Sequence, residues 1–389
     1  MKIKIGLQCV ILLASVVVSS CGPSADKQAT VSTDSTSTFN NANFEATLDG
    51  KQTGLFILEN HNGVKAAITN YGGRLVSLMV PDKNGKMTDV VVGFKSVQEY
   101  ENSTEPYFGA TIGRFGNRIA KGKFTLDGKG YTLFTNNGAN TLHGGKKGYQ
   151  GVVWDANKLN DSTLQLSYVS KDMEEGFPGT LNVKVTYSLT TDNGFKCDYE
   201  ATTDKKTVVN ITNHAFFNLN GEGSGNVLNH TVQIYADKYT PVDAGLIPTG
   251  KLEQVQGSPF DFTQPATIGA RINDSANEQI KNGMGYDHNY VLTGSRVNGM
   301  THAATVAGDQ SGIVMDVYTM EPGLQFYSGN FMQSKNTFKG GTKDDFRTAF
   351  CMETQHFPDA PNQPNFPSTI LNPGDTYHTS SLYTFSKGK

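Results

Sequence analysis

Regular alternation of apolar and polar residues is the feature that most constrains how this chain can fold. In "TLNVKVTYSL" every second residue is apolar: Leu181, Val183, Val185, Tyr187 and Leu189. Successive side chains of a β-strand point to opposite faces, so a period of two predicts a strand that is buried on one side. The alternation resumes in "FKCDYEA" after the turn "TDNG", so residues 180–203 are predicted to form a β-hairpin with Asn193 and Gly194 at its tip.

Strand-like segments recur along the rest of the chain, whereas helix signals are scarce. A second hairpin is predicted around Asp127 and Gly128, and further strands at 54–59, 63–69, 74–80, 163–171, 207–212, 230–236, 302–307, 312–319, 323–328, 348–354 and 380–386. The 42 glycines and 14 prolines supply turns at short intervals. This pattern favours an all-β fold, a large antiparallel β-sandwich or barrel-like structure. Residues 43–389 contain no break in composition and are predicted to form one domain.

The charge balance excludes some classes of partner. The chain has 33 Lys and Arg against 36 Asp and Glu, a formal net charge of -3. Proteins that bind nucleic acid or an anionic membrane surface through a broad basic field carry the opposite bias. The expected partner is therefore a small neutral molecule, and no nucleic acid is expected.

The N-terminus has the composition of a targeting segment. Lys2 and Lys4 precede a short apolar run, and "VSSC" then resembles a bacterial lipobox, in which the cysteine receives the lipid. Residues 1–20 are thus predicted to be a lipoprotein signal peptide, Cys21 the lipid attachment site, and residues 21–42 a flexible Ser/Thr-rich tether. The protein would then be exported and anchored at a bacterial membrane, on its periplasmic side or at the cell surface. An ordinary cleaved signal peptide and a short transmembrane anchor are the alternatives.

Two cysteines remain in the predicted domain, Cys197 and Cys351, and both lie in strand-like runs. They fit either two buried small apolar side chains or a disulfide.

Common catalytic and cofactor signatures are absent from the sequence. It contains no G-x-x-x-x-G-K-[ST], no G-x-G-x-x-G between a strand and a helix, and no G-x-S-x-G. Metal binding by His143 and His214 with two acids is conceivable, but no H-x-H, H-E-x-x-H or C-x-x-C spacing supports it. Neither a cofactor nor a metal is expected.

Polar residues in unusual surroundings are the remaining candidates for chemistry. Asn117 and Arg118 follow a glycine-flanked turn, where a guanidinium can bind sugar hydroxyls or a carboxylate, or form a surface salt bridge. His143 precedes two glycines that allow close approach of a ligand to the backbone. His214 in "NITNHAFFNL" lies between polar and aromatic neighbours. Each histidine fits a structural role as well.

Two further candidates are acidic and lie in the C-terminal half of the chain. In "GYDHNY", Asp287 and His288 would face opposite sides of a strand, so one of them would point toward a site. Glu353 lies within an apolar strand-like run, where a carboxylate must pair or have its pKa shifted. Glu353 is therefore the best candidate for a general base.

Seven segments in order connect the sequence to a known family. "GRFGNRIAKGKF", "TLHGG", "TNHAFFNL", "PFDF", "GYDHNYVL", "EPGLQFYSGNF" and "ETQHFPDAPNQPNFPSTILNPG" together resemble aldose 1-epimerase, also called galactose mutarotase. The resemblance covers nearly all of residues 45–389.

The resemblance implies a galactose mutarotase-like β-sandwich, or supersandwich, with an open cleft for a free sugar. It implies that Glu353 is the general base and His214 the general acid. It places Asn117, Arg118, His143, Asp287 and Gln325 at sugar-binding positions. Phe216 or Phe217 would cover an apolar face of the sugar or pack in the core.

The implied reaction is interconversion of the α and β anomers of free aldoses, such as galactose or glucose, by acid-base ring opening and closure. One alternative is a carbohydrate-binding lipoprotein that uses the same cleft without turnover. Another is a hexose-6-phosphate 1-epimerase on the same fold, an option that Lys146 and Lys147 keep open because a phosphate pocket needs extra cations. Oligomeric state is not predicted.

Overall fold

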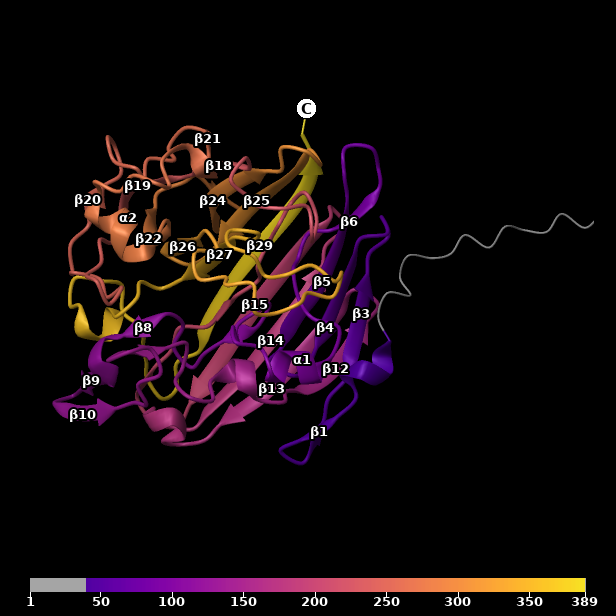
Figure 1. Ribbon diagram of the computed structural model, residues 1–389. Coiled ribbons are helices and arrows are strands. Elements are labelled where there is room, and N and C mark those ends of the chain that lie inside the picture. The colour runs from indigo at the N-terminus through magenta and orange to yellow at the C-terminus, as the bar shows by residue number, and fades with distance from the viewer. Residues whose placement is uncertain (1–39, 389) are drawn as a thin grey trace, which may run out of the picture. The chain divides into compact units, whose positions relative to one another are not determined.

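The computed structural model describes residues 40–388, which are built almost wholly from β-strands (Figure 1). The described residues contain two short α-helices, α1 (Val97–Glu101) and α2 (Glu278–Gly283). The predicted signal peptide, the lipid site at Cys21 and all but the last three residues of the tether lie outside the described residues. No helix within residues 40–388 is long and apolar enough to cross a membrane. The prediction of an all-β fold is confirmed.

The largest sheet has ten antiparallel strands. Their order is β12 (Asp155–Asn160), β13 (Thr163–Ser170), β14 (Leu181–Leu189), β15 (Gly194–Thr203), β29 (Tyr377–Lys387), β25 (Ile313–Thr319), β24 (Met300–Ala307), β18 (Thr231–Ile234) and β21 (Ala266–Thr267), with β23 (Arg296–Val297) beside β24. The predicted hairpin is β14 and β15, and every second residue of β14 is buried, as the alternation requires. Strands β29, β15, β14 and β13 lie side by side in Figure 1.

A five-stranded antiparallel sheet contributes three of the predicted site residues. Its order is β20 (Glu253–Gln254), β19 (Ala236–Tyr239), β22 (Asp287–Leu292), β26 (Gly323–Tyr327) and β27 (Cys351–Gln355). Every residue of β26 and β27 is buried, so this part of the sheet is covered on both faces. A four-stranded sheet completes the larger elements: β3 (Leu55–Glu59), β4 (Lys65–Thr69), β5 (Arg74–Pro81) and β6 (Met87–Asp89).

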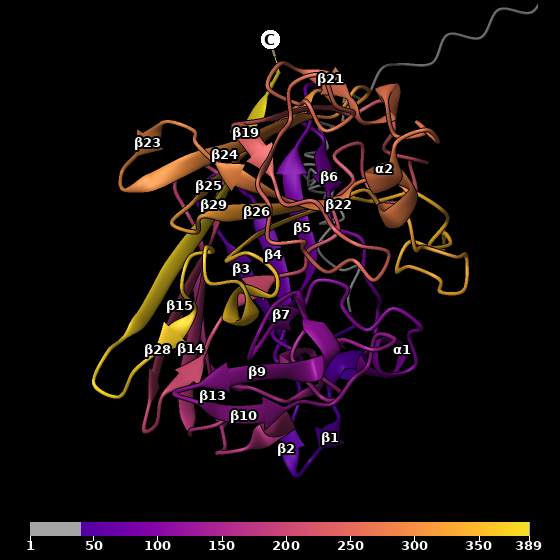
Figure 2. The ribbon, with the colours of Figure 1, turned by 90° about the vertical axis from the view of Figure 1, so that its left-hand side faces the viewer.

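Short two-stranded ribbons connect these sheets. They are β1 (Thr47–Leu48) with β2 (Lys51–Gln52), β9 (Lys123–Leu126) with β10 (Lys129–Thr132), β8 (Arg118–Ile119) with β11 (Thr141–Leu142), β7 (Thr111–Ile112) with β17 (Thr212–Asn213), and β16 (Thr207–Val208) with β28 (Ile370–Leu371). The ribbon of β9 and β10 is the second predicted hairpin, and Figures 1 and 2 both show it well away from α2 and β21. His143 follows β11 directly, and His214 follows β17 directly, so these two ribbons position the two histidines.

The main hydrophobic core joins the ten-stranded sheet to the five-stranded and four-stranded sheets. It contains the inward-facing residues of β14 and β15 together with, for example, Leu75, Tyr290 and Phe326. Cys197 and Cys351 are both buried and both free, so of the two alternatives for these cysteines the structure has the buried apolar side chains and no disulfide.

Candidate active site

His214 is held by strand-like pairing of the chain around it. It follows β17, which pairs with β7, and its backbone N–H donates to the carbonyl of Ala110 at 2.8 Å. The carbonyl of His214 accepts in turn from the N–H of Gly109 at 3.0 Å. Because both of its backbone groups are hydrogen-bonded, the main chain that carries the imidazole is held in place. His214 is 6% exposed.

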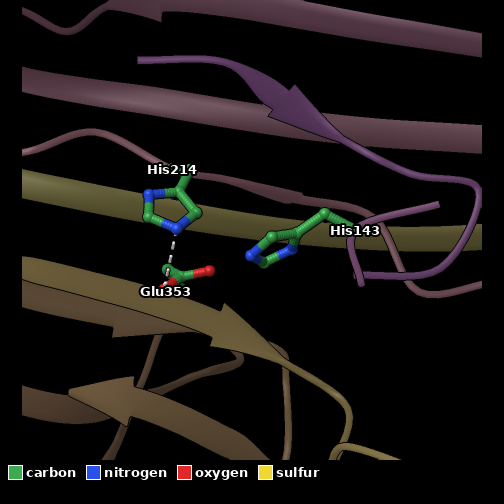
Figure 3. Close-up of side chains that lie close together, drawn as sticks. All are labelled: His143, His214 and Glu353. Atoms are coloured by element: carbon green, nitrogen blue, oxygen red, sulfur yellow. Dashed lines mark ion pairs between the residues drawn. The ribbon is translucent and has the colours of Figure 1, made fainter. Parts of the chain in front are cut away.

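Glu353 lies in the middle of β27 and meets His214 directly. Its Oε1 is 3.5 Å from Nε2 of His214, and Figure 3 shows the two side chains facing each other. Glu353 is 2% exposed, and its Oε2 has no hydrogen-bond partner within residues 40–388. One oxygen of a buried carboxyl group therefore remains available as an acceptor.

His143 and Asn117 lie together at the end of the β8–β11 ribbon. The N–H of His143 donates to the carbonyl of Asn117 at 3.0 Å, and the N–H of Asn117 donates to Nδ1 of His143 at 3.1 Å. The following glycine is required by packing, because a Cβ on Gly144 would lie 2.0 Å from the carbonyl oxygen of Gly113. The "HGG" motif is thus a tight turn that fixes the imidazole of His143.

Asp287, Gln325 and Arg118 form the polar side of the site. Asp287 is the first residue of β22 and accepts a hydrogen bond from Nε2 of Gln325 at 2.7 Å. Nη1 of Arg118 lies 3.9 Å from Oδ2 of Asp287. The prediction that Asp287 and His288 face opposite ways is confirmed, since His288 instead packs on Phe260, with ring centroids 4.4 Å apart.

The fold brings the predicted site residues together. Glu353 and Gln325 are directly opposite each other on β27 and β26, and Oε2 of Glu353 points toward His143 in Figure 3. Electrostatic interactions connect Glu353 with both Asp287 and Arg118. Neither Phe216 nor Phe217 is available to cover a sugar ring, because they are 0% and 1% exposed. Of the two alternatives for these phenylalanines, core packing is the one found.

Sequence reasoning missed three residues of this site. The side chain of Gln355 contacts the side chains of Asn117, Asn289 and Gln325 at 3.3 to 3.4 Å. It lies two residues beyond Glu353 on β27, so the period of two indicates the same face. Tyr107 stacks on His214 with ring centroids 5.8 Å apart and meets His143 edge-on at 4.5 Å. No local pattern marks it.

The third missed residue is Cys351. Its sulfur lies 3.5 Å from Nδ1 of His214, on the side of the ring away from Glu353. Cys351 is two residues before Glu353, so the same periodicity would have placed it on the same face of β27 as Glu353.

Burial shifts the pKa values of the acidic and basic groups in opposite directions. Burial and the neighbouring carboxylate of Asp287 raise the pKa of Glu353 well above 4.5. Burial lowers the pKa of His214 to about 3 and holds the pKa of His143 well below 6.5. These opposite shifts favour a proton on Glu353 over one on His214, and they favour neutral imidazoles at both histidines.

His143, His214 and Glu353 also have the spacing of a metal site, with candidate ligand atoms all within 4.8 Å of one another. The hydrogen bond from Asn117 argues against this use. Because a backbone N–H occupies the lone pair on Nδ1 of His143, the proton of the neutral ring must lie on Nε2. A protonated ring nitrogen cannot bind a metal, so the three residues fit proton transfer and oxygen recognition better.

Comparison with known proteins identifies the family. The family model described as "Aldose 1-epimerase" matches residues 54–384. The chain belongs to the aldose 1-epimerase family. It is 44% identical to galactose mutarotase from Bos taurus over 324 residues, which cover 83% of this chain and 91% of the relative. It is 37% identical to aldose 1-epimerase from Escherichia coli over 342 residues, or 87% and 96% of the two chains.

Solved aldose epimerase structures have the same fold. An aldose epimerase homologue from C. elegans superposes with a TM-score of 0.80 at 30% identity, covering 87% of this chain and all of that one. A galactose 1-epimerase from Lactobacillus acidophilus superposes with a TM-score of 0.77 at 26% identity, covering 88% and 97%. The chain is thus an isomerase that interconverts the α and β anomers of aldoses, on the galactose mutarotase-like fold that the sequence motifs imply.

Proposed function

We propose that Glu353 and His214 carry out the two proton transfers of anomer interconversion, with Glu353 as the base and His214 as the acid that open the ring. Ring opening removes a proton from the anomeric hydroxyl O1 and adds one to the ring oxygen O5. Both oxygens are bonded to C1, so the base and the acid must lie side by side. The 3.5 Å separation of Oε1 of Glu353 and Nε2 of His214 is the observation that carries this proposal.

The proton transfers balance over one turnover. Glu353 takes the proton of O1–H while the C1–O5 bond breaks, its electron pair goes to O5, and Nε2–H of His214 protonates O5. An open-chain aldehyde then rotates about C1–C2. Neutral His214 takes back the proton from O5–H, O5 attacks the other face of C1, and Glu353 returns its proton to O1. Each residue serves once as acid and once as base, and no cofactor enters.

The pair needs one shared proton at every stage. Ring opening starts with a Glu353 carboxylate and a His214 imidazolium, and the open-chain stage has a Glu353 carboxylic acid and a neutral His214. The directions of the pKa shifts favour the carboxylic acid with the neutral imidazole in the sugar-free site. Conversion of this state to the Glu353 carboxylate and His214 imidazolium moves one proton across the 3.5 Å between the two side chains, so no proton is taken from solvent.

The polar side of the site suits a neutral sugar. Sugar hydroxyls need donors and acceptors in pairs, and Arg118, Asp287 and Gln325 provide both kinds within one hydrogen-bonded group. Asn117 joins this group through Gln355, which contacts Gln325, and His143 is hydrogen-bonded to Asn117. We propose that these five residues orient a free aldose such as galactose or glucose with C1 against Glu353 and His214.

The alternatives have less support. A phosphate group needs cations without partners, but Lys147 pairs with Asp49 at 2.5 Å, and Arg118 faces Asp287. The amine of Lys146 lies over the ring of Phe134, with 5.8 Å to the centroid. A protein that only binds sugar gains nothing from a buried carboxyl group beside an imidazole, because burial of both is costly without a partner.

The proposal is tested by following fresh α-galactose and α-glucose to anomeric equilibrium by polarimetry or proton NMR. The wild-type chain should accelerate relaxation, and Glu353→Gln should reduce kcat by about 10²- to 10⁴-fold, as expected for a positioned acid-base group. Glu200→Gln is the matched control, because Glu200 is exposed on β15. Full activity in Glu353→Gln would refute the assignment.

We further propose that the protein is a lipoprotein anchored through Cys21, with residues 21–42 as its tether. The support is the sequence "VSSC" after a basic and then apolar leader. An enzyme held at the periplasmic side of a membrane or at the cell surface would act on sugars outside the cytoplasm. When the full-length chain is expressed in a bacterium, it should partition with membranes, and Cys21→Ala should release it. Retention of Cys21→Ala in the membrane fraction would count against the anchor.

A further inference from the structure

The two histidines of the site differ in what lies against Nδ1. The backbone N–H of Asn117 donates to Nδ1 of His143, so in the neutral ring Nε2 carries the proton. The sulfur of Cys351 lies 3.5 Å from Nδ1 of His214. A thiol is a weak donor and a weak acceptor, so it permits Nδ1 of His214 to keep a proton.

The surroundings of His214 favour a proton on Nδ1. Nε2 lies 3.5 Å from Oε1 of Glu353, and burial and Asp287 raise the pKa of this carboxyl group, which favours its protonated form as a donor to a free lone pair on Nε2. The ring is also held in orientation, since Phe216 stacks on it at 4.9 Å and Tyr107 at 5.8 Å between centroids. Nδ1 therefore remains directed at Cys351 in either protonation state.

We propose that His143 and His214 are held in opposite tautomers, and that Cys351 is the positioning residue that accepts a hydrogen bond from Nδ1–H of His214. His143 then presents a fixed Nε2–H donor to a sugar oxygen. His214 presents Nε2 as the nitrogen that gains and loses the proton. This inference rests on the proposed function, because it assigns hydrogen bonding to a sugar oxygen to His143 and proton transfer at the ring oxygen to His214.

A thiol suits this position better than a carboxylate. Burial raises the pKa of Cys351 well above 9, and Glu353 raises it further when it is ionised, so the thiol stays neutral. A neutral weak acceptor fixes the tautomer without stabilising the imidazolium as a carboxylate would. The imidazolium of His214 therefore remains a strong acid toward O5, consistent with its pKa of about 3.

The tautomers can be read directly from the ¹⁵N chemical shifts of the two imidazole rings in the full-length protein at neutral pH. In the wild type, the proton is expected on Nδ1 of His214 and on Nε2 of His143. Cys351→Ala should move a measurable fraction of His214 to the Nε2–H form and leave His143 unchanged. Cys351→Ser, which keeps an acceptor, should retain the wild-type tautomer.

Kinetics give a second readout. Cys351→Ala should lower kcat by roughly 10- to 100-fold, the usual cost of losing a group that orients a reacting side chain, with KM unchanged. Cys351→Ser should recover most of the loss. Cys197→Ala is the matched control, because Cys197 is equally buried and free but lies on β15.

Two results would overturn the inference: a proton on Nε2 of His214 in the wild type, or the same His214 spectrum in Cys351→Ala as in the wild type. The wild-type spectrum needs no variant to fold, so the proposal stays falsifiable if Cys351→Ala does not. The ¹⁵N chemical shifts of the ring nitrogens are measured without catalytic turnover. Failure of this inference is therefore distinguishable from failure of the proton-transfer assignment, which Glu353→Gln tests.

Discussion

Oε1 of Glu353 lies 3.5 Å from Nε2 of His214, and burial shifts the pKa values of these two side chains in opposite directions. In the proposed mechanism the pair holds one proton that can lie on either partner, as the opening and closing of a sugar ring in one site requires. Their opposite shifts also give the two residues opposite contributions to stability as pH changes.

Glu353→Gln should stabilise the fold at neutral pH. The pKa of Glu353 is raised in the folded state, so above its usual value of 4.5 the folded chain holds a proton that the unfolded chain has lost. Stability therefore falls as pH rises above 4.5. The glutamine side chain of the variant does not titrate, so the variant does not lose stability in this way. Its Tm should exceed that of the wild type by about 2 °C or more at pH 7. The difference should shrink at pH 4, and Glu200→Gln should show no such dependence in thermal unfolding.

His214→Asn should have the opposite pH dependence. The folded pKa is about 3 and the ordinary value is 6.5, so between these values the unfolded chain binds a proton that the folded chain does not. Stability is therefore lost as pH falls below 6.5. Relative to the wild type, the Tm of His214→Asn should rise as pH is lowered from 7 to 4. His61→Asn, at an exposed histidine, is the control, and a parallel trend in both variants would contradict the assignment.

The pH profile of kcat/KM should lack the acid limb that an ordinary histidine gives. The pair keeps its single proton until His214 gains a second one near its pKa of about 3. Activity at pH 5 should therefore lie within about twofold of that at pH 7, after subtraction of spontaneous mutarotation. Initial rates measured by NMR across this range test the point, and a midpoint near 6.5 would show that His214 titrates normally.

Asp287→Asn should weaken sugar binding more than it slows the chemistry. The carboxylate accepts from Gln325 and faces Arg118, and the amide loses acceptor capacity and charge at a buried position. KM should rise by about tenfold, the usual cost of one hydrogen bond to a charged group, with a smaller change in kcat. Steady-state kinetics check this against Asp161→Asn, where the side chain is 99% exposed.

The sequence predicts strands well where burial alternates. β14 and β15 follow the period of two over their full lengths, and their hairpin needs only local turn chemistry. The predicted strands do not include β12, and of β22 they include only the strand assumed at Asp287 and His288. Five of the six residues of β12 are exposed, and the first four residues of β22 are all buried, so neither shows clean alternation.

The site is harder to predict from the residues alone. Glu353 stands out because it interrupts an apolar run, whereas its partner His214 lies 139 positions earlier. The two are brought together by long-range pairings, that of β17 with β7 and the antiparallel bridge between Phe217 and Phe350. No sequence period encodes that register. Tyr107, in a loop, has no pattern at all. The positions proposed to bind the sugar were predicted from the resemblance to a family. In the structure Gln325 lies opposite Glu353, and Asp287 and Arg118 interact with it electrostatically.

A double-mutant cycle tests the central claim most directly. The rates of α-galactose mutarotation would be measured for the wild type, Glu353→Gln, His214→Asn and the double variant. If the two residues transfer protons as a pair, the double variant should be about as slow as the slower single variant, because removing either partner already disables the pair. Losses that multiply, so that the double variant is slower by the product of the two single effects, would contradict the account.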